Sequence, residues 1–379
     1  MLPQPGTLRV GPPPYWPGLP GIVPIAITFT IAAGIVATSG LVLFGWYSIR
    51  VMALSVAATL LVESTFNAIK GRPSSWSESH ALLVGVLFAC TLPPTASWRV
   101  VLTGALVAIL FGEALSGGLG NYVWHPVAVG RVAVQMLFYD ELTPERWPVL
   151  GPGKLLWGNL DQAVPMPAQG TWNSHDLPQA ADAWLVRPLE DLLRVAFTGD
   201  GTSPAGGLVT FIRDVAPPWR DTLTGVAGGA IGEACGAVIL IAACLLIWRG
   251  FLRWPLIVAS LAATIATAAI LPVRIESPNG GSTWLAWPGW QSLPIGAAYV
   301  MYHLTASGVM FVALLLAPDP SSSPLTRRGC VWFGAIIGVL TVVLRGIAGL
   351  PAAPYWALLA ANTMVPTINR LTRRRVFGT

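Results

Sequence analysis

Charged residues are scarce in this 379-residue sequence. Asp, Glu, Lys and Arg together make up 10% of it, whereas soluble domains carry roughly 25%. Hydrophobic residues reach 54%, and the mean hydropathy is +0.64. This balance excludes a soluble globular enzyme, a disordered chain and a disulfide scaffold. It predicts an all-α integral membrane protein.

The sequence also lacks the motifs of common catalysts and metal sites. The patterns GxxxxGK[ST], GxSxG, HExxH and CxxC are absent, so any energy coupling must come from a gradient, from redox chemistry or from partner subunits. Cysteine is rare, and the four cysteines show no metal-ligand spacing. We therefore predict no metal site. The net charge of +5 does not indicate nucleic-acid binding, because the basic residues flank apolar runs.

Apolar runs long enough to cross a bilayer recur through the chain, and they predict about ten transmembrane helices. The abundance of Gly (40) and Pro (33) indicates that some of these helices are kinked or broken. The ten stretches cover residues 21–45, 49–69, 80–96, 99–118, 124–140, 222–248, 253–273, 293–317, 329–347 and 352–370.

Basic residues set the expected orientation. With both termini in the cytoplasm, eleven Lys and Arg residues fall inside and four fall in short outer loops, namely Arg50, Arg99, Arg274 and Arg345. The chain then divides into a Pro-rich cytoplasmic tail (1–20), a first five-helix half (21–140), a periplasmic loop (141–221), a second five-helix half (222–370) and a basic cytoplasmic tail (371–379).

Two halves of five spans imply inverted topology, because an odd number of crossings reverses the second half. A weak trace of a repeat supports this: Thr91–Pro94 ends the third span, and Ala317–Pro320 ends the eighth. Inverted repeats with interrupted helices place a binding site near the midplane, facing half-helix N-termini. Close helix packing explains the many glycines equally well.

The densest group of potential binding residues lies between residues 116 and 131. Glycines let backbone approach a ligand closely, and Pro126 is suited to the first turn of a helix. We predict a clamp for an anion or a cofactor. The alternative is that Arg131 pairs with Glu113 and only locks the bundle. The clamp would use Gly117, Gly118, Gly120, Asn121, His125 and Arg131.

Acidic side chains inside apolar spans are the second candidate feature. Glu113 and Glu233 are predicted to line an ion or proton pathway. Glu63 lies near a span end, from which it can reach the membrane interface. His303 is interpreted as a hydrogen-bonded core histidine.

Several motifs occur in order over about residues 50–375. They are His80 to Pro94, Phe111-Gly112, Gly117 to Asn121, Pro126 to Arg131, Gly228 to Glu233, Asp319 to Gly329 and Asn362 to Arg370. Together they resemble the NqrB/RnfD family. The resemblance implies ten helices in two inverted halves and a place in a bacterial inner-membrane complex. Such complexes pass electrons between reduced nicotinamide or ferredoxin and quinone or NAD, and they couple this transfer to Na⁺ or H⁺ export. Partner subunits, the lipid bilayer and quinone are the implied partners, and this chain is not an enzyme alone.

The family's flavin motif is altered here. In the family, FMN is esterified to the Thr of a [DS]-x-x-S-G-A-T motif in the outer loop. The matching stretch is 200–208, where Gly206 occupies the Thr position and offers no hydroxyl. Asp200 matches the motif, and Thr202 and Ser203 are the nearby hydroxyls. We predict a divergent member that binds FMN non-covalently or not at all.

Two other functions stay open from the sequence. Inverted five-helix halves also suit a small-solute transporter or channel. A structural membrane subunit that has lost its flavin is the third interpretation, because of Gly206.

Overall fold

The computed structural model describes residues 22–71, 80–114, 122–142, 219–225, 229–276, 282–285, 293–305 and 308–373. Both predicted tails, apart from residues 371–373, lie outside these ranges. So does the predicted periplasmic loop 141–221, apart from its edges, and with it the altered flavin motif 200–208.

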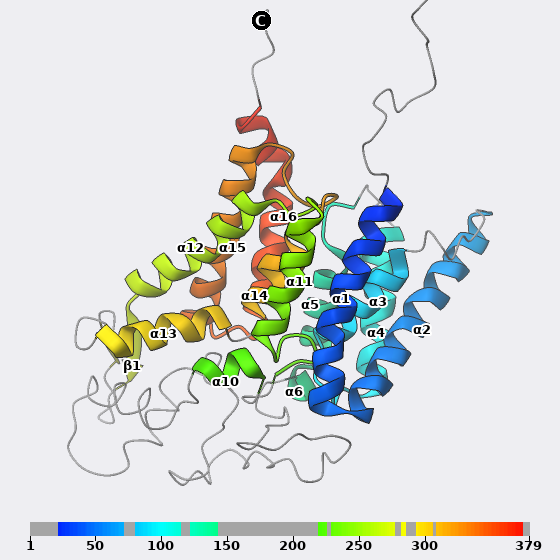
Figure 1. Cartoon of the computed structure of the whole chain (residues 1–379), viewed down its shortest axis with the longest axis horizontal. Helices are drawn as coiled ribbons and strands as arrows, with labels where there is room; N and C mark the ends of the chain where they lie inside the picture. The colour runs from blue at the N-terminus through cyan, green and yellow to red at the C-terminus, as the bar shows by residue number, and fades with distance from the viewer. Residues whose placement is uncertain are drawn as a thin grey trace, which may run out of the picture.

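The first half is a bundle of antiparallel helices (Figure 1). Apolar residues dominate all but the last, single-turn helix, because lipid or other helices surround the side chains. The helical backbone satisfies its own N–H and C=O groups. The elements are α1 (Ile22–Phe44), α2 (Trp46–Ile69), α3 (His80–Cys90), α4 (Trp98–Val107) with its π-helical continuation Ala108–Ala114, α5 (Pro126–Leu137) and the single turn α6 (Tyr139–Leu142).

The second half contains shorter helical pieces and one hairpin. Strands β1 (Val273–Glu276) and β2 (Ser282–Leu285) pair antiparallel, with Arg274 opposite Trp284. The helices are α10 (Trp219–Thr224), α11 (Gly236–Trp248), α12 (Trp254–Ile270), α13 (Leu293–Thr305), α14 (Val309–Phe311) with its π-helical continuation Val312–Leu316, α15 (Arg327–Gly346) and α16 (Ala353–Leu371).

Three described helices are long and apolar enough to span a membrane: Pro24–Phe44, Trp46–Ile69 and Arg327–Gly346. A fourth span is formed if α13 and the segment Val309–Leu316, which are bent by 56° at their junction, are taken together. Large apolar side chains are widely exposed on the helices, as lipid contact requires. The structure therefore fits the predicted helical, multi-pass membrane class. Ten spans in two inverted halves stay a prediction.

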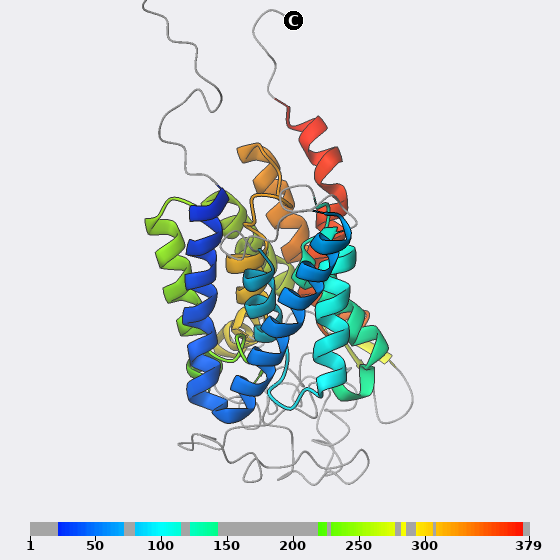
Figure 2. The ribbon, with the colours of Figure 1, turned by 90° about the vertical axis from the view of Figure 1, so that its right-hand side faces the viewer.

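One end of the bundle carries Arg253, Arg327, Arg328, Arg370 and Arg373, and we call it the basic end. There α1, α12 and α15 begin and α16 ends, so the first and last described residues lie on the same side (Figures 1 and 2). Trp248 and Arg249 end α11 at this level. The hairpin, α10 and α13 lie at the opposite end (Figure 1).

The span expected over residues 222–248 is interrupted in the structure. Residues 229–235 leave the helical path between α10 and α11. The Ile231 N–H donates to the Leu92 carbonyl (2.9 Å), and the Gly232 N–H donates to the Cys90 carbonyl (2.8 Å). The N–H groups of Ile231 and Gly232 thus bond to carbonyls at the end of the short helix α3. In an unbroken helix they would bond to carbonyls of their own helix. The two halves are joined at this point by main-chain hydrogen bonds.

Small residues bring α12 and α15 into close contact. Gly334 and Gly338 lie one turn apart on α15, against the backbone of α12 at Leu256 and Ser260. A methyl group at either glycine would overlap α12 main-chain atoms. Close approach of this kind is how helices associate in a membrane, where no hydrophobic driving force acts between them. The packing interpretation of the glycines holds for this pair.

Candidate functional site

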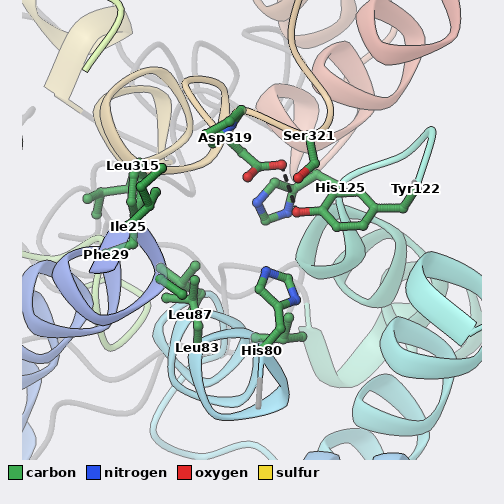
Figure 3. Close-up of a pocket in the computed structure, with 13 residues that line it drawn as sticks. Ile25, Phe29, His80, Leu83, Leu87, Tyr122, His125, Leu315, Asp319 and Ser321 are labelled. Carbon is green, nitrogen blue, oxygen red and sulfur yellow. Dashed lines mark hydrogen bonds between the residues drawn. The ribbon is translucent and has the colours of Figure 1, made fainter. Parts of the chain in front are cut away.

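A cavity opens near the basic end between the two halves of the chain (Figure 3). Apolar side chains of α1, α3 and the end of the broken eighth stretch form one side of it. Five polar side chains lie on the other side, and four of them, His80, Tyr122, His125 and Asp319, form a rim. The lining residues are Ile25, Ala26, Phe29, His80, Leu83, Val84, Leu87, Tyr122, His125, Leu315, Asp319, Pro320 and Ser321.

The rim is held together by ring contacts and one hydrogen bond. The Tyr122 hydroxyl donates to Oδ2 of Asp319 across 2.8 Å. The His80 ring stacks on Tyr122 at a centroid distance of 5.7 Å, and the His125 ring meets Tyr122 edge-on at 6.5 Å. Figure 3 shows the two histidines, Tyr122 and Asp319 converging on one side of the cavity. The first half supplies three of these groups, and the second half supplies Asp319.

Asp319 is fixed by the turn that follows it. Its Oδ2 accepts from the Ser322 N–H (3.3 Å) and from the Ser322 hydroxyl (3.1 Å), while its carbonyl accepts from the Ser323 hydroxyl (2.7 Å). Asp and Ser side chains form such local bonds readily in turns. The carboxylate therefore reaches the cavity in a defined position.

Asn362 supports the rim from behind. It is fully buried on α16. Oriented to satisfy both neighbours, its side-chain amide accepts from the His125 N–H (2.9 Å) and donates to the Ser322 carbonyl (3.3 Å). One side chain of the tenth stretch thus ties the start of α5 to the Asp319 turn.

His125 has an unsatisfied ring nitrogen. The residue precedes Pro126, the first residue of α5, and is only 4% exposed. Its Nδ1 has no hydrogen-bond partner among the described residues. Buried polar atoms are nearly always paired, so a lone ring nitrogen beside an apolar cavity matches a ligand that carries a polar edge on an apolar body.

A second polar cluster lies deeper in the bundle, where the chain is interrupted. Glu233 sits on the non-helical turn before α11 and is 7% exposed. Tyr355, on the first turn of α16, donates its hydroxyl hydrogen bond to Oε1 of Glu233. Gly308, in the left-handed conformation at φ 72°, lies against the same carboxylate. A Cβ at Gly308 would come within 2.6 Å of the Glu233 carboxyl carbon.

Arg131 approaches this cluster from the first half. It lies on α5, is 2% exposed, and its Nη1 donates to Oε1 of Gln135 (2.7 Å). Its guanidinium carbon is 5.9 Å from the centre of the Tyr355 ring, within the range of a cation–π contact. The structure thus brings Arg131 and Glu233, two sequence-predicted residues, to one shared neighbour, Tyr355.

Several predicted site residues cannot be placed. Gly117, Gly118, Gly120 and Asn121 lie outside the described residues, and so do Asp200, Thr202 and Ser203. Glu113 belongs to the π-helical segment, but its side chain is outside the described part of the chain, so its expected pairing with Arg131 stays a prediction. Within the described ranges no three His, Cys, Asp or Glu side chains gather as metal ligands.

Arg345 is not the outer-loop residue that the sequence predicts. It lies in the last turn of α15, is 2% exposed, and its Nη1 donates to the His303 carbonyl at 3.3 Å. The same Nη1 is 3.4 Å from Nδ1 of His303. A cation at this place stabilises the carbonyl end of the interrupted helix α13. His303 is buried there, as a core histidine should be.

Sequence reasoning missed His80, Tyr122, Asp319, Tyr355 and Asn362 as site residues. A usable signal existed for two of them. Asp319 is an acidic residue that directly follows an apolar run, and Asn362 is an amide inside another. Both stand in the stretches that carry the family resemblance. Tyr355 gave no signal, because a tyrosine in a membrane helix is ordinary.

Comparison with known proteins gives a consistent result. Residues 11–378 match the sequence profile of the NQR2, RnfD, RnfE family. The chain is 30% identical over 356 residues to the D-type subunit of the ion-translocating oxidoreductase complex of Stutzerimonas stutzeri, covering 89% of this chain and 87% of that protein. Proteins with the same name from Yersinia pestis (28% over 344 residues, 88% of each) and Halorhodospira halophila (28% over 353 residues, 92% and 89%) are also similar.

Proposed function

The chain belongs to the NQR2, RnfD, RnfE family, and from this membership we propose that it is the D-type membrane subunit of an ion-translocating oxidoreductase complex. The relatives that carry this name align with nearly the whole chain. The redox reaction belongs to the complex rather than to this chain alone, so other subunits are its partners. The expected placement is the bacterial inner membrane, with ten spans in two inverted halves and both termini in the cytoplasm.

We assign the redox group to the cavity at the basic end. An isoalloxazine ring presents carbonyl oxygens and nitrogens along one edge of an apolar planar system. The cavity offers a matching set of groups. On one side are the His125 Nδ1, which has no partner among the described residues, the Tyr122 hydroxyl and the Asp319 carboxylate, and on the other side are leucine and phenylalanine side chains. These residues would bind, orient and shield the ring. A bound flavin supplies one- and two-electron redox chemistry.

The proposed attachment is non-covalent FMN. Gly206 has no side-chain hydroxyl with which to form the phosphoester that the family uses. The predicted 117–121 segment directly precedes Tyr122 in the sequence, so its glycines are next to the cavity rim along the chain. Quinone is the other planar redox molecule that this lining suits.

Ion movement is assigned to the central cluster. Glu233 is a buried carboxylate where two interrupted stretches meet, and buried carboxylates in membrane proteins mark ion or proton pathways. Tyr355 holds one of its oxygens, and Arg131 lies near the Tyr355 ring. Glu113, on the π-helical segment, is the second predicted acid of this pathway.

Flavin content tests the assignment. The detergent-purified complex should show flavin absorbance that leaves with the supernatant after acid denaturation. Tyr122→Phe removes only the hydroxyl that bonds Asp319. It should weaken flavin retention about fivefold, the equivalent of roughly 1 kcal/mol for one hydrogen bond. Tyr47→Phe is the matched control, because the Tyr47 ring lies beside the Arg50 guanidinium and does not line the cavity.

Three outcomes would contradict the assignment of non-covalent flavin to this cavity. Flavin that stays on the denatured polypeptide would mean covalent attachment, and equal retention in Tyr122→Phe and wild type would exclude this cavity as the site. Quinone without flavin would reassign the cavity and leave the family assignment intact.

Interrupted spans that meet at a buried carboxylate also occur in solute transporters, so we keep that function as the alternative. Flux of a small solute into liposomes that contain the chain alone, without any electron donor, would favour it. No flux under those conditions, together with bound flavin in the complex, favours the redox subunit.

A further inference from the structure

Four exposed arginines gather where α15 begins and α16 ends. Arg327 and Arg328 are the first two residues of α15, Arg370 is in the last turn of α16, and Arg373 follows it. All four are exposed. We call them the α15–α16 arginine surface. They lie at the basic end, above the level at which α1 begins (Figure 1).

Hydrogen bonds between the two helix ends fix this surface. The Leu325 N–H donates to Oδ1 of Asn369 (3.1 Å), and the hydroxyls of Thr326 and Thr372 are 2.6 Å apart. Thr326 also caps α15 by accepting from the Gly329 N–H (3.0 Å). Arginines from two helices are therefore presented together on one rigid support.

The positive charge of this surface is not offset by its own segments. Residues 320–335 and 363–373 contain no Asp or Glu. Two of the arginines occupy the start of a helix, where the macrodipole is already positive and acidic residues are the favourable choice. The nearest acid in sequence, Asp319, is bonded to Tyr122 and to its own turn. Such a concentration of like charge creates a positive potential that attracts anions.

Apolar side chains next to the arginines indicate which kind of anion binds this surface. Leu325 and Leu371 are 79% and 82% exposed, and Trp332 is 63% exposed. Trp332 follows Arg328 by four residues, so the indole lies one turn further into the bundle on the same helix face. A guanidinium one helical turn above an indole matches the order of phosphate and membrane interface in a lipid leaflet.

We propose that the α15–α16 arginine surface is a binding site for the phosphodiester groups of an anionic phospholipid, and that a lipid with two phosphates suits it best. Arginine forks bind phosphate oxygens in pairs, and four of them from two helices can serve two phosphates. This site is separate from the cavity and from Glu233, and it stands whether or not the redox assignment is correct.

The test measures lipid retention by the full-length protein. Wild type is reconstituted in phosphatidylcholine nanodiscs with a graded fraction of cardiolipin, and retained lipid is counted by native mass spectrometry after release. The variant is Arg327→Gln with Arg328→Gln. The control is Arg50→Gln with Arg99→Gln, which removes two exposed arginines that lie beside Tyr47 and Trp98 on α2 and α4. Both variants lose the same charge.

Wild type and the control should retain cardiolipin equally. The Arg327/Arg328 variant should bind it about 30-fold more weakly, because each basic residue near a lipid surface contributes about 1 kcal/mol. Equal retention by all three proteins would overturn the proposal, and so would equal loss in the control.

Two further arms exclude other anions. Displacement of cardiolipin by millimolar inorganic phosphate would mean a soluble phosphate site and would overturn the lipid assignment. Protection of Arg327 and Arg328 from phenylglyoxal in the assembled complex, in lipid that contains only phosphatidylcholine, would show that an acidic partner subunit covers the surface instead. Modification of both arginines by phenylglyoxal in the complex, in lipid that contains only phosphatidylcholine, supports the lipid site.

Discussion

The hydrogen bond between Tyr355 and Glu233 gives the sharpest test of the central cluster. Both side chains are buried, with 1% and 7% of their surface exposed. Tyr355→Phe removes one hydroxyl and leaves the ring that faces Arg131. Glu233→Gln keeps the shape of the acceptor but removes its charge. The pair of substitutions and their combination form a double-mutant cycle.

The expected coupling energy follows from the type of bond. A hydrogen bond to a charged group contributes about 1.5–3 kcal/mol, and a neutral one contributes about 1 kcal/mol. Because the amide oxygen of the Glu233→Gln variant still accepts from Tyr355, the cycle measures the difference between the charged and the neutral bond. If Glu233 is ionised, the coupling energy should therefore be about 0.5–2 kcal/mol. Water cannot replace the lost hydroxyl easily, because the carboxylate is packed against Gly308.

The free energy of unfolding is measured by titration with SDS in mixed micelles for wild type, both single variants and the double variant. Thr341→Val serves as the control, since the Thr341 hydroxyl bonds the Ile337 carbonyl of its own helix. Its combination with Glu233→Gln should be additive. A coupling energy below about 0.5 kcal/mol for the Tyr355–Glu233 pair, the scatter of independent sites, would refute the contact.

Three other predictions concern the interrupted stretches and the cavity. Gly308→Ala should destabilise the protein by more than about 1–2 kcal/mol, because the left-handed backbone disfavours a Cβ and the added methyl would overlap Glu233. The control is Gly34→Ala on α1, where the space around the glycine is open. It should stabilise the protein by about 0.5–1 kcal/mol in the same unfolding assay. Glu233→Gln should lower ion transport at least tenfold in proteoliposomes of the complex while flavin content stays at the wild-type level, and unchanged transport would contradict the pathway. Asn362→Leu should lower the free energy of unfolding by about 2–5 kcal/mol and also release flavin, because the backbone N–H of His125 and the carbonyl of Ser322 lose their partner. Full flavin retention would show that the rim does not need this amide.

Simple apolar spans were predictable from the sequence alone. The stretches 21–45, 253–273 and 352–370 correspond to α1, α12 and α16 within a few residues. Their lengths and charge-free interiors are local properties, and a lipid environment leaves the backbone little choice but a helix.

The interruptions were less predictable, because distant contacts create them. The stretch 222–248 resembles one apolar span, yet residues 229–235 leave the helix to bond carbonyls at Cys90 and Leu92. Nothing near Ile231 in the sequence indicates those partners. The sequence prediction for Arg345 was wrong for the same reason. An arginine in a loop and an arginine that caps the interrupted helix α13 have the same local sequence, and only the fold distinguishes them.

The candidate site was predictable in part. His125, Arg131 and Glu233 stand out because polar side chains are costly inside apolar spans. The sequence groups His125 with Arg131 and leaves Glu233 apart, whereas the structure places His125 at the cavity and Arg131 near Glu233 in the centre. Tyr355 joins the second pair only through the fold, so no pattern in the sequence could identify it.

Helix α16 contacts both the cavity rim and the cluster around Glu233. Tyr355 and Asn362 are seven residues apart, about 10 Å along a rigid rod, and one holds the central carboxylate while the other holds the cavity rim. A displacement of α16 along its axis by the length of one hydrogen bond would break the Tyr355 contact and the Asn362 contacts together. In the proposed function, the cavity binds the redox group and Glu233 lies on the ion pathway, so an axial displacement of α16 would couple the two steps through one helix.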